Sequence, residues 1–320
     1  MIADIAMRNL TSPAVLFFLI GAAASLARSD LSIPDQVVRL LSLYLMMSIG
    51  YRGGLEIAHS GVNTQMIAAI AAGIGLSFAT PFLAERVLRI LTRLAPVDRA
   101  AVAGHYGSIS AVTFAAVTSV TTQMALPSDG FMVGVAAAME TPAILACLLL
   151  AGRQGGEVDA RAMLREVFLN GSVVVLLGAL AVGIVASPLA TAPVKPFLVD
   201  LFPGFLCLFL LEMGLIAGRG LRDSWRTISP GLLLFALAMP VIGAALGAGL
   251  GWTVGLPVGS LAIFMTLGAS ASYIAVPAAL RIALPQANLA MALTMSIGVT
   301  FPVNLLAGIP LYIGIAQAVR

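Results

Sequence analysis

The sequence predicts an all-α polytopic membrane protein with ten transmembrane helices, arranged as two inverted repeats of five. Three observations predict this fold. The chain is 60% hydrophobic and only 10% charged, whereas soluble domains carry about 25% charged residues. Its apolar residues come in runs that are long enough to cross hydrocarbon, which takes about 20 residues as a helix. Similar short strings also recur, in the same order, in the two halves of the chain.

Short polar or proline-containing connectors separate the ten apolar runs. The first run is short and follows Arg8, as in a secretory signal peptide, but we interpret it as the first helix because the internal symmetry requires it. The expected spans are residues 11–28, 36–58, 62–92, 97–124, 129–152, 165–187, 195–219, 227–252, 257–282 and 286–317.

Basic residues flank these spans unevenly. With the N-terminus outside, 13 of the 17 Lys and Arg residues fall at cytoplasmic ends and 4 fall outside. Positively charged connectors stay in the cytoplasm, so both termini are expected in the periplasm and the protein in the bacterial inner membrane. The same residues form no basic patch with interleaved aromatic residues, which argues against nucleic-acid binding despite the net charge of +3.

The repeat divides the chain near residue 158, giving domains 1–157 and 158–320. Five is an odd number, so two halves of five spans insert with opposite orientation. Inverted repeats are typical of transporters, in which the two halves exchange conformations to give alternating access. The matching strings are Ser48–Gly54 with Glu212–Gly218, Ser108–Ala116 with Ser270–Ala278, and Thr141-Pro142 with Phe301-Pro302.

Two strings of small residues interrupt the fourth and ninth spans, Gly107-Ser-Ile-Ser110 and Gly268-Ala-Ser-Ala-Ser272. Gly and Ser are poor choices inside a helix, and Pro277 weakens the second span further. We expect both helices to break and cross at mid-membrane, where freed amide groups and half-helix N-termini suit an anion. The alternative is a packing seam of small residues. No Arg or Lys lies nearby, which favours a small, singly charged anion.

Two acidic residues, Glu140 and Glu212, fall well inside apolar spans. A charged group there costs about 2.5–3.5 kcal/mol, so such residues are usually functional. With Thr141 and Thr300 they are expected to offer oxygens to Na⁺; the alternative is a protonated carboxyl bonded to a neighbouring helix. The candidate Na⁺ ligands are Ser110, Thr113, Glu140, Glu212, Ser270, Ser272 and Asn304.

Three further side chains are candidates for roles near the site. Arg52 and Glu56 are four residues apart and are expected to pair on one helix face, as a gate or as a structural pair. His105 is interpreted as a hydrogen-bonded core residue rather than a proton relay. Tyr273 either closes over the substrate or packs. The sequence has no phosphate-binding loop, metalloprotease motif or nucleophile elbow, so we do not expect an enzyme.

Three strings, Gly104–Phe114, Leu211–Gly218 and Gly268–Pro277, resemble the sodium-dependent bicarbonate transporter family of the cyanobacterial SbtA type. The likeness covers essentially the whole chain. It implies core and gate domains formed from both halves, symport of bicarbonate with Na⁺, and a homotrimer. It also implies that the anion and Na⁺ bind at Gly107, Ser108, Ile109, Ser110, Ala111, Ala269, Ser270, Ala271, Ser272 and Tyr273.

One departure concerns regulation. The cyanobacterial members have a longer segment between the halves and bind a PII-like regulatory protein, whereas the connector here runs only from about Arg153 to Arg165. This argues against a PII-like partner.

The sequence hypothesis is therefore Na⁺-driven import of bicarbonate across the lipid bilayer, with no organic cofactor. One alternative is a transporter of another small anion or carboxylate, with or without Na⁺. Another is a membrane-embedded receptor or assembly protein, although no soluble output domain is visible.

Overall fold

The computed structural model describes residues 2–152, 171–186, 192–224, 228–273, 276, 280, 284 and 286–320. These residues form helices and no strands. Within these described residues, six helices are long and apolar enough to cross a membrane, or seven if the bent pair at the N-terminus counts as one span. The chain is therefore an all-helical polytopic membrane protein, and the count of ten spans stays a prediction. The central connector, the boundary at residue 158 and Pro277 lie outside the described residues.

The helices follow the expected apolar runs closely. Several begin at a capping side chain: the Asn63 amide oxygen accepts from the amide of Met66 at 2.8 Å, and Ser229 caps a helix whose first residue is proline. In the first half the helices are α1 (Ile2–Leu10), α2 (Pro13–Leu26), α3 (Asp35–Ser60), α4 (Thr64–Leu91), α5 (Pro96–Gly107), α6 (Ala111–Gln123) and α7 (Met132–Gly152). In the second half they are α9 (Gly171–Val185), η1 (Pro196–Asp200), α11 (Phe202–Ser224), α12 (Pro230–Val254), α13 (Val258–Ala269), α15 (Leu289–Leu293), η2 (Thr294–Thr300), α16 (Phe301–Val303), η3 (Asn304–Gly308) and α17 (Ile309–Val319).

Two spans differ from the prediction in detail. An additional helix, α1, precedes the first span and meets α2 at a bend of 61°. Ser12 caps α2 and Pro13 begins it, because proline cannot continue the preceding helix. The last span contains two π-helical segments, η2 and η3, which flank the short α16. Such widened turns are frequent at functional sites.

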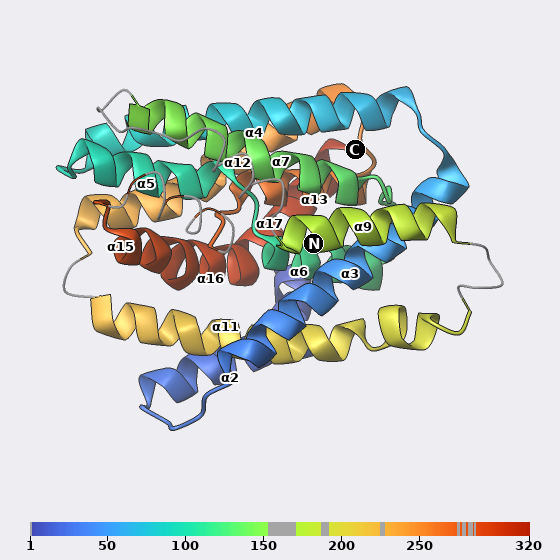
Figure 1. Ribbon diagram of the computed structural model, residues 1–320, viewed down its shortest axis with the longest axis horizontal. Coiled ribbons are helices and arrows are strands. Elements are labelled where there is room, and N and C mark those ends of the chain that lie inside the picture. The colour runs from blue at the N-terminus through green and yellow to red at the C-terminus, as the bar shows by residue number, and fades with distance from the viewer. Residues whose placement is uncertain are drawn as a thin grey trace.

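Four helices form one group, in which α2 packs on α11, α3 packs on α9, and α3 touches α11. Figure 1 shows α2 and α11 together along one side of the molecule, with α4 on the opposite side. Glycines permit both close pairings: a Cβ on Gly214 or Gly218 would collide with α2, and a Cβ on Gly50 or Gly54 would collide with α9. Backbones that approach this closely are typical of membrane helices.

Apart from η1, which contacts α3 and α11, the remaining helices form a second group, in which α4 packs on α5 and α7, and α12 packs on α13. Contacts at its ends involve corresponding positions of the two halves. At one end the Asp129 carboxylate accepts from the hydroxyl of Ser260 at 2.8 Å. At the other, the Asp98 carboxylate accepts from the amide of Asn288 at 2.8 Å. The offsets, 162 from Asp98 to Ser260 (260 − 98) and 159 from Asp129 to Asn288 (288 − 129), are close to the offsets of 160 to 164 between the repeated strings.

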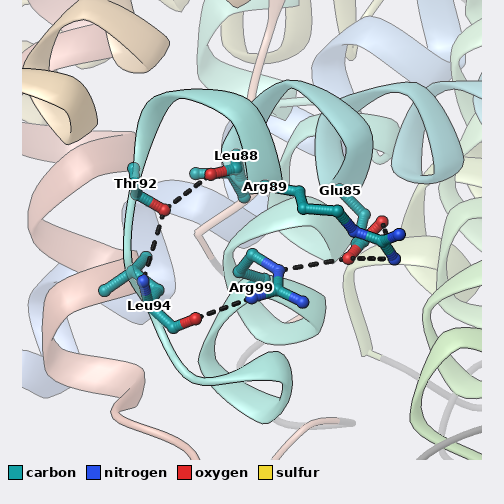
Figure 2. A network of polar contacts seen from close by, with 6 residues as sticks. All are labelled: Glu85, Leu88, Arg89, Thr92, Leu94 and Arg99. Atoms are coloured by element: carbon teal, nitrogen blue, oxygen red, sulfur yellow. Dashed lines mark hydrogen bonds and ion pairs between the residues drawn. The ribbon is translucent and has the colours of Figure 1, made fainter.

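A polar network fixes the corner between α4 and α5 (Figure 2). The carboxylate of Glu85, only 5% exposed, pairs with Arg89 at 3.2 Å and with Arg99 at 3.1 Å. Arg99 also donates to the carbonyl oxygen of Leu94 at 2.7 Å, and the Thr92 hydroxyl donates to the last turn of α4. These bonds set the direction in which α5 enters the second group of helices.

Candidate functional site

Both predicted strings interrupt their helices. The first helix ends at Gly107 and resumes at Ala111, with Ser108 in an extended conformation (φ −93°, ψ 151°). The second ends at Ala269, where Ser270 is also extended (φ −81°, ψ 162°). Extended backbone at these positions releases peptide groups from the helical hydrogen-bond ladder. Those groups need other partners.

The two interruptions supply partners to each other. The amide of Ser110 donates to the hydroxyl of Ser270 at 3.1 Å. The amide of Ser272 donates to the carbonyl oxygen of His105 at 2.7 Å, and the His105 ring donates from Nδ1 to the carbonyl oxygen of Ser272 at 2.6 Å. All four residues are buried. The interrupted helices therefore touch inside the protein, and we call the contact between residues 105–111 and 269–273 the crossing.

The crossing presents a helix N-terminus and free hydroxyl groups. Ser110 caps α6 by accepting from the amide of Thr113 at 3.2 Å, so the positive end of the α6 dipole points into the crossing. Within the described residues, the buried hydroxyls of Ser108 and Tyr273 have no hydrogen-bond partner of normal geometry. An anion accepts from such donors, and an unpartnered buried hydroxyl is otherwise costly. The crossing thus suits a small anion with hydrogen-bonding oxygens.

The predicted cation ligands fall into two sets. Thr113 and Asn304 are buried at or beside the crossing. The Asn304 amide donates to the carbonyl oxygen of Ala269 at 2.8 Å and its oxygen accepts from Tyr312 at 2.9 Å. Asn304 therefore braces the end of α13, a function that the sequence did not indicate.

Within the described residues, no hydrogen bond joins the two intramembrane acids to the crossing. Glu140 is buried in α7. Glu212 pairs with Arg219 at 2.9 Å along α11. No three His, Cys, Asp or Glu side chains gather into a metal cluster among the described residues. Roles for Glu140 and Glu212 as Na⁺ ligands stay predictions.

A tyrosine that sequence reasoning missed ties the crossing to two other helices. The hydroxyl of Tyr106 lies 2.7 Å from that of Thr300, which donates to the carbonyl oxygen of Ala236 at 3.0 Å. The position of Tyr106 beside Gly107 was the only signal in the sequence. Thr300, expected as a cation ligand, has its hydroxyl engaged in this link.

The residues Arg52 and Glu56 line a cavity of about 50 Å³ between the two groups of helices, together with Asp129. The structure records no ion pair between Arg52 and Glu56. The Arg52 guanidinium instead lies 6.0 Å from the centre of the Phe202 ring, a cation–π distance. A gate formed by Arg52 and Glu56 stays a prediction. It does not depend on a direct ion pair between the two side chains.

Comparison with known proteins assigns the chain to one family. The family model described as the Na⁺-dependent bicarbonate transporter superfamily matches residues 13–317. No curated protein matches the chain at a significant level.

Proposed function

The chain belongs to the Na⁺-dependent bicarbonate transporter superfamily, and we propose that it imports bicarbonate by symport with Na⁺ through alternating access. It is a multi-pass membrane protein of a transporter family. The observation that carries the proposal is the contact between the two interrupted helices, in which Ser110 donates to Ser270. It gathers amide and hydroxyl groups at one buried point.

Bicarbonate is small, carries one charge and has three oxygens. The free hydroxyls of Ser108 and Tyr273 and the N-terminus of α6 offer donors to these oxygens. We assign the anion to residues 107–111 and 269–273 as a whole. No fixed cation contacts the crossing among the described residues, so binding is weak enough for release in each cycle.

The Na⁺ ion is proposed to bind beside the anion, where it adds the positive charge that the protein does not supply. Each ligand then raises the affinity for the other. The proposed oxygen ligands come from Ser110, Thr113, Ser270, Ser272 and Asn304, with Glu140 and Glu212 as candidates from farther along the chain. A tenfold Na⁺ gradient supplies about 1.4 kcal/mol per ion. A second Na⁺ would make the cycle electrogenic and add about 2.3 kcal/mol per 100 mV.

The proposed architecture has ten spans in two inverted repeats. Reciprocal contacts support it: α2 packs on α11 as its expected counterpart α9 packs on α3, and the links between Asp129 and Ser260 and between Asp98 and Asn288 are related in the same way. In this proposal the group containing α2, α3, α9 and α11 is the gate domain and the other helices are the core domain. We further propose a homotrimer in the inner membrane with both termini periplasmic.

The test is uptake of labelled bicarbonate into proteoliposomes with and without an inward Na⁺ gradient. We expect uptake of labelled bicarbonate that rises with the inward Na⁺ gradient. Uptake that does not depend on Na⁺ would contradict the proposed coupling, and competition by acetate, formate or nitrate would indicate a different anion.

Ser110→Ala and Ser272→Ala should impair uptake at normal membrane abundance. Normal transport by both variants would instead favour a packing seam.

A further inference from the structure

His105 makes an unusual double contact with the crossing. The residue is fully buried in the last turn of α5, two positions before the helix ends at Gly107. Its main-chain carbonyl accepts from the amide of Ser272 at 2.7 Å, and its ring nitrogen Nδ1 bonds the carbonyl oxygen of the same Ser272 at 2.6 Å. His105 thus makes a hydrogen bond to each backbone polar group of Ser272, its N–H and its carbonyl oxygen.

These contacts determine where the ring carries its proton. A carbonyl oxygen only accepts, so Nδ1 must donate. Within the described residues Nε2 is buried without a partner, and a proton there would be a buried donor with no acceptor, which is costly. The Ser296 hydroxyl lies 3.3 Å from Nδ1 and donates to the carbonyl oxygen of Ala292 at 3.0 Å. The contacts therefore select the neutral ring with hydrogen on Nδ1.

We infer that His105 is a positioning residue of the anion site: its Nδ1–H holds the peptide of Ser272, and thereby the orientation of the hydroxyl of Tyr273, for the ligand. The inference rests on the proposed function of the crossing. Ser272 is followed directly by Tyr273, whose buried hydroxyl has no hydrogen-bond partner of normal geometry within the described residues. Loss of the ring donor would remove one of the two hydrogen bonds from His105 that hold the backbone of Ser272 and release this short segment to rotate.

Two substitutions separate the hydrogen bond from the volume of the ring. In His105→Asn the side-chain amide nitrogen takes the place of Nδ1, whereas in His105→Gln the amide reaches the place of Nε2. We expect the Asn variant to keep a KM for bicarbonate near that of the parent protein. The Gln variant should raise this KM about tenfold, because one buried carbonyl loses its donor, with a smaller effect on maximal uptake. Equal KM values in the parent, Asn and Gln proteins would overturn the inference.

A second measurement does not depend on transport. The chain contains only two histidines, His59 and His105. His59 is exposed and lies in α3, far from His105 in the sequence. Histidine-selective ¹⁵N labelling of the His59→Gln protein therefore gives the signals of a single ring by solid-state NMR. The inference expects a protonated Nδ1 and an unprotonated Nε2, with shifts that move when bicarbonate and Na⁺ are added. A ring protonated on Nε2, or shifts that ignore both ions, would overturn it. Absence of uptake by the parent protein, in contrast, would defeat the proposed function and leave the tautomer result intact.

Discussion

The close approach of α12 to the interrupted helix α13 gives the most direct test of the packing. A Cβ built on Gly243 would overlap the carbonyl oxygen of Gly268, and a Cβ on Gly268 would lie 2.6 Å from the carbonyl oxygen of Gly243. Both obstacles are backbone atoms, which cannot turn aside as a side chain can. Gly243→Ala therefore forces α12 away from α13. The affected contact, at Gly268, lies two residues before Ser270, where α13 has ended.

The magnitude follows from two opposing terms. Overpacking a tight interior contact costs about 1–3 kcal/mol, whereas replacing a helical glycine by alanine gains roughly 0.5–1 kcal/mol. Gly249→Ala, in the same helix, is the matched control, because nothing lies within 4 Å of its Cβ. The helical gain is common to both variants. Their difference in the free energy of unfolding therefore isolates the contact, at about 1–3 kcal/mol.

Denaturant unfolding of the two variants in one detergent, followed by tryptophan fluorescence, measures this difference. We expect Gly249→Ala to match or exceed the parent in stability and Gly243→Ala to fall below it, with reduced uptake in proteoliposomes. If the two variants were equally stable, α12 and α13 would not touch through these glycines. The packing of the second interruption described above would then be wrong.

Three other substitutions test the crossing and the corner that leads into it. Ser270→Ala removes the acceptor for the amide of Ser110, and an unsatisfied buried amide costs about 1–3 kcal/mol; the expected result is lower stability with reduced bicarbonate uptake, measured in the same two assays. Glu85→Gln leaves the guanidinium of Arg99, which is 14% exposed, without its charge partner and should cost about 3 kcal/mol. Arg89→Ala should cost less than about 1 kcal/mol, because Arg89 is 67% exposed; equal losses in the two variants would contradict the network of Figure 2.

The sequence was most informative where local chemistry decides the backbone. Ser108 and Ser110 compete with the helix for backbone hydrogen bonds, and Ser110 caps the helix that follows. Such effects act over a few residues, so the interruption at Gly107 could be predicted from a short string. The family resemblance could be read from the same strings, and the match over residues 13–317 confirms it.

Contacts between distant residues could not be predicted in this way. Asn304 braces the carbonyl of Ala269, 35 positions away, and His105 holds Ser272, 167 positions away. Asparagine and histidine in an apolar run indicate only that a partner exists, since either side chain can donate or accept in many geometries. The partner is fixed by how α5, α13 and the last span pack. The pairing of Arg52 with Glu56 stays a prediction: spacing permits a pair on a helix, and the nearby ring of Phe202 offers Arg52 another contact.

The distribution of charge links the fold to the proposed mechanism. Ion pairs such as Glu85 with Arg99 and Glu212 with Arg219 lie outside the crossing, while the contacts at the crossing are made by neutral hydroxyl, amide and imidazole groups. A neutral site leaves an anion in the membrane without a counter-charge, so the anion binds well only when a cation arrives with it. A fixed arginine at the crossing would provide tighter binding but remove this dependence. In the proposed mechanism, the neutrality of the crossing is therefore the feature that makes the affinity for the anion depend on Na⁺.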